Sequence, residues 1–335
     1  MNLCSENGLG MEKKQVIVQK LKTVITVLGR LLTVLSIVFV IYSLYKIDID
    51  WSYFSHPYVI FLDVLGLSLL VVLYSYVNAY IWKLYLDFFS GVHTPAYEVI
   101  IIYLKSNIAK YLPGNVIQYV GRNVLGKKLE IGQKSIAMAT VAELISLVCG
   151  NIIFALVMSL QNTKSVVGRL WTEYNLRKSV SVITILGIVI VVICSCYLLK
   201  SGFIRKTRDN ITGDKIKKVV RLFCIVFILY SIVFVMSALI LLRIFYILNA
   251  NIGFANVASA NALSWLAGYI VPGAPGGIGI REVVLVWLLE AECLPEIVIL
   301  AAVLLRVCVI LGDFLSFLGA VFMDAIKRRK ETGNA

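Results

Sequence analysis

The segment KSNIAKYLPGNVIQYVGR combines a break in an apolar stretch with several positive charges. Pro113 lacks a backbone N–H and Gly114 tolerates unusual dihedral angles, so the chain can turn sharply there. A helix that begins near Asn115 would present free N–H groups, and Lys110 and Arg122 would add positive charge. This combination suits an anion such as phosphate. The alternative is a cytoplasmic loop whose Lys and Arg residues follow the positive-inside rule.

A second glycine-rich motif, VPGAPGGIGIRE, lies in the C-terminal half of the chain. Gly276, Gly277 and Gly279 allow the backbone to approach a ligand closely, and Arg281 and Glu282 fall in the first turn of the helix that follows. Backbone amides, a helix N-terminus and a guanidinium together suit a phosphate oxygen. The motif is not a P-loop, because no Gly-Lys-Ser/Thr follows it. The alternative is a tightly packed turn in which Arg281 and Glu282 pair with each other.

Three further ionisable residues, Glu143, Arg306 and Asp313, lie inside long apolar stretches. A charged side chain at the centre of a bilayer costs about 2.5–3.5 kcal/mol, so each needs a partner or water. One interpretation is a set of structural ion pairs that join two halves of the protein. The other is a polar cavity for a lipid headgroup, in which arginines hold phosphate and carboxylates balance amines or pair with the arginines. The predicted headgroup-binding residues are Lys110, Tyr111, Pro113, Gly114, Asn115, Arg122, Glu143, Gly276, Gly277, Gly279, Arg281, Glu282, Arg306 and Asp313.

The amino-acid composition indicates that these residues lie in a membrane protein. Of 335 residues, 60% are apolar and only 15% are charged, which excludes a disordered chain, a disulfide scaffold and an ordinary cytosolic enzyme. The formal net charge of +13 fits cytoplasmic loops rich in Lys and Arg, next to anionic lipid. His56 and His93 are the two histidines and no CxxC pair exists, so neither a metal site nor a cofactor is expected. No catalytic residues are predicted.

The apolar blocks predict an all-α polytopic membrane protein with six full spans and two re-entrant broken hairpins. The hairpins are expected within Ala96–Leu129 and Phe254–Glu290, where Pro and Gly interrupt the two motifs. The predicted spans are Leu31–Lys46, extended back to about Val24, Tyr58–Trp82, Ser135–Leu160, Ser179–Leu199, Val219–Leu242 and Glu296–Phe322.

The order of these parts divides the chain into a basic cytoplasmic N-terminus (1–23), a single transmembrane domain (24–325) and a basic cytoplasmic tail (326–335). Each half of the domain, about 24–160 and 179–325, runs span, span, hairpin, span. An odd number of full spans in each half would insert the second half upside down, so we hypothesise an inverted repeat. Lys and Arg concentrate on the side that holds both termini, which predicts a plasma-membrane protein with cytoplasmic ends.

The segments KYLPGNVIQYVGR, ATVAELISLVCG and PGGIGIRE, in that order, resemble the lysylphosphatidylglycerol synthetase membrane-domain family. This is the flippase-like part of bacterial multiple peptide resistance factors, which also occurs as a stand-alone protein, and the resemblance spans about residues 20–325. It implies movement of a lipid such as aminoacylated phosphatidylglycerol between leaflets. Full-length members also carry a soluble aminoacyltransferase domain. The chain ends at Ala335 without one, so transferase activity is not expected.

The leading expectation is therefore a protein that binds and flips an aminoacylated or anionic phosphatidylglycerol. The alternatives are a membrane component of a lipid aminoacyl (lysyl) transferase or polyprenyl-linked glycosyltransferase system, or an anchor for a separate synthase. The expected partners are membrane phospholipid and such a transferase, with no direct role for nucleic acid. Homo-oligomerisation stays open.

Overall fold

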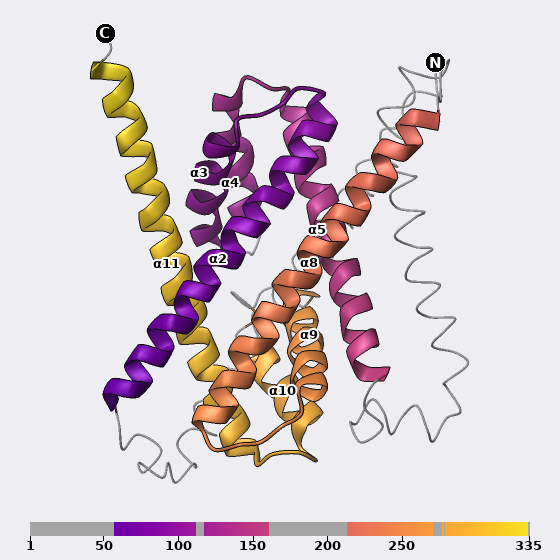
Figure 1. The fold of residues 1–335 in the computed structure, drawn as a ribbon, viewed down its shortest axis with the longest axis vertical. Helices are drawn as coiled ribbons and strands as arrows, with labels where there is room; N and C mark the ends of the chain where they lie inside the picture. The colour runs from indigo at the N-terminus through magenta and orange to yellow at the C-terminus, as the bar shows by residue number, and fades with distance from the viewer. Residues whose placement is uncertain (1–56, 112–116, 161–212, 271–276, 278, 334–335) are drawn as a thin grey trace, which may run out of the picture.

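The computed structural model describes residues 57–111, 117–160, 213–270, 277 and 279–333 (Figure 1). These residues are almost entirely helical, with eight α-helices and no strand among them. Several predicted features lie outside the described residues: the cytoplasmic N-terminus (1–23), the spans at Leu31–Lys46 and Ser179–Leu199, and Pro113, Gly114, Asn115 and Gly276.

Four long helices form the frame of the molecule. They are α2 (Pro57–Ser90), α5 (Gln133–Leu160), α8 (Gly213–Ile247) and α11 (Pro295–Gly333). Each contains an apolar stretch long enough to cross a bilayer, which needs about 20 residues. These helices correspond to four of the six predicted spans, and their length and composition indicate a membrane protein.

The long helices extend beyond the predicted apolar blocks. α2 continues past Trp82 to Ser90, and α11 continues past Phe322 through the basic tail to Gly333. Hydropathy marks where apolar residues stop, whereas a helix continues as long as its residues favour it. Ion pairs one turn apart support these polar ends: Lys83 lies 2.6 Å from Asp87, and Arg328 lies 3.1 Å from Asp324.

Two groups of short helices fill the frame from opposite ends (Figure 1). The first contains α3 (Ala96–Asn107), the 3₁₀ turn η2 (Ile108–Tyr111), α4 (Ile117–Leu125) and the 3₁₀ turn η3 (Gly126–Leu129). The second contains α9 (Phe254–Ile270) and α10 (Ile280–Leu289). With 12, 9, 17 and 10 residues, α3, α4, α9 and α10 are all shorter than a full crossing. In each group, the helices end and restart on either side of the predicted Pro-Gly interruption.

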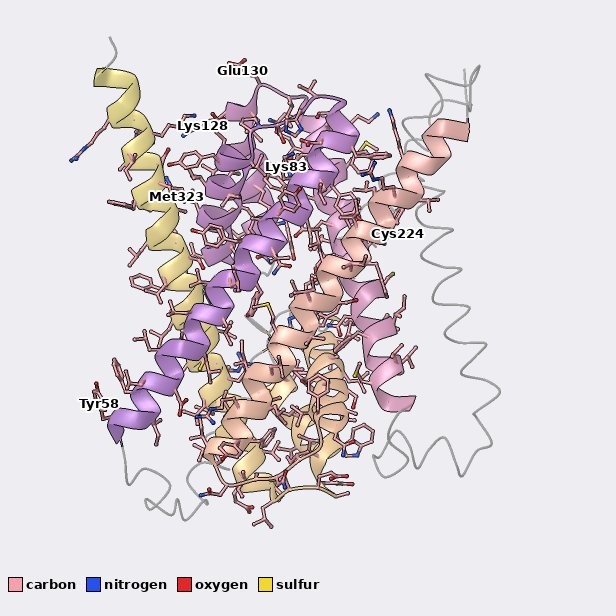
Figure 2. All side chains as sticks on the ribbon, in the orientation of Figure 1. Tyr58, Lys83, Lys128, Glu130, Cys224 and Met323 are labelled. Carbon is pink, nitrogen blue, oxygen red and sulfur yellow. The ribbon has the colours of Figure 1, made fainter. Side chains whose placement is uncertain are left out.

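Two apolar clusters hold the short helices in place. One packs Trp82, Tyr85 and Tyr230 among α2, α3, α5 and α8, and the other packs Phe245 and Leu285 among α8, α9, α10 and α11. Large apolar side chains also cover the outside of the long helices, among them Leu69, Leu73, Ile228, Phe314 and Phe322. Charged residues such as Lys83, Lys128 and Glu130 gather at one end of the molecule, whereas Tyr58 marks the other end of α2 (Figure 2). An apolar exterior with polar ends is the surface that a bilayer covers.

The helices α2 and α11 cross closely at Gly312, in a row of small residues that Ser316 and Gly319 continue. A Cβ atom on Gly312 would lie 2.5 Å from Cβ of Val71 and 2.7 Å from the backbone oxygen of Ser68. We expect Gly312→Ala to lower the free energy of unfolding by about 1–3 kcal/mol, because the two backbones must separate. Thermal unfolding in detergent measures the loss.

Gly66→Ala on α2 is the matched control, because nothing lies within 4 Å of a Cβ atom at that position. It should leave the unfolding temperature unchanged or slightly higher, since alanine favours a helix over glycine. Equal stability of the Gly312 and Gly66 variants would contradict the close crossing.

Candidate functional site

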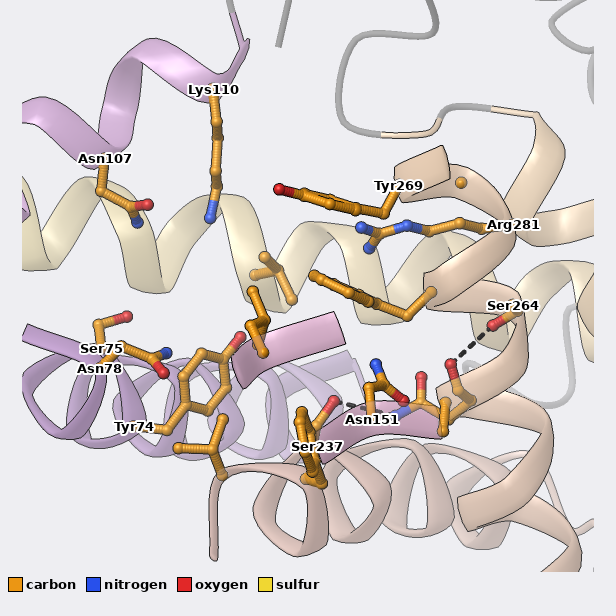
Figure 3. A pocket seen from close by; sticks show the side chains of 18 of the residues that line it. Tyr74, Ser75, Asn78, Asn107, Lys110, Asn151, Ser237, Ser264, Tyr269 and Arg281 are labelled. Atoms are coloured by element: carbon orange, nitrogen blue, oxygen red, sulfur yellow. Dashed lines mark hydrogen bonds between the residues drawn. The ribbon is translucent and has the colours of Figure 1, made fainter. Parts of the chain in front are cut away.

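A cavity of about 240 Å³ lies where the two groups of short helices meet between the long ones (Figure 3). Side chains from every α-helix of the described region contribute to its wall. Its polar lining residues are Tyr74, Ser75, Asn78, Tyr103, Asn107, Lys110, Tyr111, Gln118, Tyr119, Arg122, Glu143, Asn151, Ser237, Asn261, Ser264, Trp265, Tyr269, Arg281, Glu282 and Arg306. Such a concentration of polar groups inside an apolar bundle makes this cavity the candidate functional site.

The first charged contact in the wall is a buried ion pair between Arg122 on α4 and Glu143 on α5. Nη1 of Arg122 donates to Oε2 of Glu143, and the hydroxyl of Tyr103 donates to Oε1 at 3.0 Å. The guanidinium also lies 3.8 Å from the ring centre of Tyr103 and 5.7 Å from that of Trp82. Both charged side chains are almost completely buried. The aromatic rings and the carboxylate together replace the water that the arginine has lost.

The second ion pair, between Arg306 and Glu282, joins α11 to α10. Arg306 on α11 donates through Nε to Oε1 of Glu282 and, at 3.0 Å, through Nη2 to the backbone oxygen of Gly277. The other carboxylate oxygen, Oε2 of Glu282, accepts the backbone N–H of Gly279 at 2.7 Å. Glu282 therefore pairs with Arg306 rather than with its neighbour Arg281. The interpretation as a turn with a local Arg281–Glu282 pair is wrong, because the fold brings α11 against the start of α10.

The glycines of the second motif permit a close backbone approach. Gly277 and Gly279 have φ angles of +71° and +87°, which L-residues with a side chain rarely adopt. A Cβ atom on Gly277 would lie 2.9 Å from Cα of Gly268 on α9 and 2.9 Å from Nε of Arg281. The absence of a side chain on Gly268 and Gly277 thus leaves the space that the stem of Arg281 occupies.

The third charged group connects η2 with α11. Nζ of Lys110 lies 2.6 Å from Oδ2 of Asp313, which also accepts the hydroxyl of Tyr111. Asn107 donates to Oδ1 at 3.0 Å. The carboxylate is buried, whereas the lysine side chain is 27% exposed. Lys110 thus faces the cavity, and its counter-ion, Asp313, lies deeper in the protein.

Arg281 differs from the other cations of the cavity. It forms no ion pair with any described residue. Its Nε atom is buried without a hydrogen-bond partner, as is Nε of Arg122, but Arg122 has a carboxylate partner. Its guanidinium lies 5.6 Å from the ring centre of Trp265. Figure 3 shows Arg281 and Lys110 extending toward the same part of the cavity from α10 and η2.

The charges around the cavity therefore do not balance. Lys110, Arg122 and Arg306 each meet one carboxylate, and Arg281 is left over. The exposed members of two pairs are cations, since Arg306 is 24% exposed against 3% for Glu282. The cavity consequently presents positive charge, as an anion-binding site requires.

Seven of the predicted residues line the cavity: Lys110, Tyr111, Arg122, Glu143, Arg281, Glu282 and Arg306. Asp313, Gly277 and Gly279 lie behind the wall and bond to residues that line it. Lys105, a cation of the first motif, lies away from this site and pairs with Asp324 at 2.5 Å.

Apart from Tyr111, the uncharged residues of the wall were not predicted from the sequence. Asn78, Asn151 and Asn261 lie in apolar stretches of α2, α5 and α9 and line the cavity. An amide inside an apolar block carries the same signal as a charge there, only weaker, because its burial also needs a partner. The aromatic residues Trp265 and Tyr269, stacked at 4.9 Å, had no such signal.

Within the described ranges, no group of three or more His, Cys, Asp and Glu side chains could hold a metal ion. No protein-family model matches the chain, and no curated protein sequence matches it.

Proposed function

We propose that this protein binds the anionic headgroup of a phospholipid in the central cavity and moves it between the leaflets of a membrane. The observation that carries the proposal is Arg281, a buried cation without a counter-ion among the described residues, at a cavity whose other cations are paired. A phosphodiester carries one negative charge, which is the charge that the site lacks. Two further cations, Lys110 and Arg306, face the same space.

The physical problem in lipid translocation is the cost of taking a phosphate through hydrocarbon. An ion moved into a medium of low dielectric constant loses tens of kcal/mol of solvation unless fixed charges replace the water. The cavity provides arginine, lysine and amide groups that replace it, and the acyl chains would stay in the surrounding lipid.

The two groups of short helices suggest how the site opens in turn to each side. They enter the frame from opposite ends and meet at the cavity, where the hydroxyl groups of Tyr119 and Tyr269 lie 3.1 Å apart. This arrangement supports the proposed six-span inverted repeat, in which two related halves rock against each other. It also agrees with the resemblance to the flippase-like membrane domains.

Exchange of a fluorescent phosphatidylglycerol between leaflets of reconstituted vesicles tests the proposal. We expect Arg281→Gln to slow exchange at least about tenfold, because a hydrogen bond to a charged group contributes about 1.5–3 kcal/mol. Dithionite quenching of the outer-leaflet probe gives the rate.

Arg243→Gln is the matched control. Arg243 pairs with Asp63 at 2.9 Å, is half-exposed and does not line the cavity. Its variant should exchange lipid at the wild-type rate. Exchange by the Arg281 variant at that same rate would remove Arg281 from the mechanism, and no exchange by the wild-type protein would refute translocation.

A further inference from the structure

Each carboxylate at the cavity is already paired with a cation of the protein. Oε1 of Glu143 accepts from Tyr103 and Oε2 from Arg122. Both oxygens of Glu282 are likewise used, by Arg306 and by the N–H of Gly279.

Asp313 is occupied in the same way. Oδ1 accepts from Asn107, and Oδ2 meets both Tyr111 and Lys110. An ammonium group in the headgroup would therefore find no unpaired carboxylate. It would either share a carboxylate with a cation of the protein or displace that cation, which would remain buried without a counter-ion. The cavity already has one more cation than carboxylates, because Arg281 has no carboxylate partner among the described residues. The added positive charge of an amine-bearing headgroup makes it a poor fit.

The wall instead offers neutral groups that both donate and accept hydrogen bonds. Asn78 and Asn151 line the cavity, and neither side chain bonds to another described residue. Asn151 is 3% exposed, and its Oδ1 atom is a buried acceptor without a donor. Asn261 donates to Ser237 at 2.9 Å in the same wall (Figure 3).

Three buried polar atoms of the residues that line the cavity lack a hydrogen-bond partner. One is Nε of Arg122, whose guanidinium already pairs with Glu143, and the other two are complementary to two parts of one molecule. Nε of Arg281 is a charged donor that requires an anionic oxygen, and Oδ1 of Asn151 is an acceptor that requires an O–H or N–H. A buried polar group without a partner is costly, so each favours a ligand that completes it.

We infer that the bound headgroup is a phosphodiester whose other substituent carries hydroxyl groups and no amine, such as glycerol, inositol or a sugar. The inference rests on the proposed lipid-binding function and narrows its substrate class. Arg281 takes the phosphate, and the amide wall around Asn151 takes the hydroxyls. An aminoacylated phosphatidylglycerol, which carries an ammonium group, does not fit this site, because each carboxylate at the cavity is already paired with a cation.

Native mass spectrometry of the purified protein with equimolar lipids tests the headgroup without requiring transport. Phosphatidylglycerol and phosphatidylinositol should bind at least about fivefold more than phosphatidylethanolamine or lysylphosphatidylglycerol. Equal or stronger binding of lysylphosphatidylglycerol would overturn the inference.

A competition experiment shows which part of the lipid is recognised. Excess soluble glycerol 3-phosphate should compete with phosphatidylglycerol for the protein if the headgroup alone is recognised. Lack of competition would assign recognition to the whole lipid, in keeping with the proposal.

The Asn151→Leu variant tests the hydroxyl contact directly. Its affinity for phosphatidylglycerol should fall about 2- to 10-fold, the effect of one neutral hydrogen bond, while its affinity for phosphatidic acid stays unchanged. Asn256→Leu is the control, because Oδ1 of Asn256 is also buried without a partner but lies outside the cavity. An equal loss for both lipids, or in both variants, would overturn the assignment of Asn151, and thermal unfolding identifies a variant that has merely lost its fold.

These measurements separate the two proposals. Selective binding of hydroxyl-bearing lipids without leaflet exchange would refute translocation and support the inference. Leaflet exchange that is as fast for lysylphosphatidylglycerol as for phosphatidylglycerol would support translocation and overturn the inference.

Discussion

Glu143→Leu is expected to lower the free energy of unfolding by about 3–5 kcal/mol, because the change leaves Arg122 buried without its counter-ion. The guanidinium is 2% exposed and cannot reach water, and its Nε atom already lacks a hydrogen-bond partner. The same substitution also removes the acceptor of the Tyr103 hydroxyl at 3.0 Å. The contact between α4 and α5 should loosen, so the unfolding temperature in detergent is the first measurement.

A double variant separates the charge from the packing. Arg122→Met combined with Glu143→Leu removes both charges and keeps similar volumes, so it should recover most of the lost stability. Asp63→Asn breaks the half-exposed pair with Arg243 and should cost less than about 1 kcal/mol. If the Glu143 variant were as stable as the Asp63 variant, the Arg122–Glu143 pair would not support the structure.

Gly277→Ala is expected to lower the free energy of unfolding by about 2–5 kcal/mol, nearly as much as Glu143→Leu. A φ of +71° costs a residue with a side chain about 1–2 kcal/mol, and the clash with Cα of Gly268 at 2.9 Å adds about 1–3 kcal/mol. The new methyl group would also lie 2.9 Å from Nε of Arg281, so it should displace this cation as well. Lipid exchange and thermal stability should therefore fall together.

Gly253→Ala provides the comparison for that variant. Gly253 precedes α9 and has no positive φ, and a methyl group added to it would meet no atom within 4 Å. Its alanine variant should behave as the wild type in both assays. Wild-type exchange by the Gly277 variant would show that the loop can shift without moving Arg281.

The four long helices were predictable because one quantity, the length of an apolar stretch, decides whether a segment can cross a bilayer. An apolar stretch of about 20 residues must satisfy its backbone hydrogen bonds internally when lipid surrounds it, so its length alone predicts α2, α5, α8 and α11. The Pro-Gly interruptions predicted where short helices end for the same local reason. The helix ends were less accurate, as α11 shows, because ion pairs and helix propensity extend a helix beyond its apolar residues.

The composition of the site was also partly predictable. A charge inside an apolar block is costly wherever the chain folds, so Glu143, Arg306 and Asp313 are conspicuous in the amino-acid sequence itself. Asn151 is not, because a single neutral amide costs less to bury and stands out less.

The amino-acid sequence by itself determined that this protein contains helices of membrane-crossing length and that charged residues lie within its apolar stretches, since both follow from composition and local chain length. Only the tertiary structure decided which charges meet. Glu282 pairs with Arg306, 24 residues away, and Asp313 pairs with Lys110, more than 200 residues away. Such partners depend on how helices cross, which no local pattern encodes. Because those pairings use the carboxylates around the cavity, Arg281 is left without one among the described residues, and on that imbalance the proposed site depends.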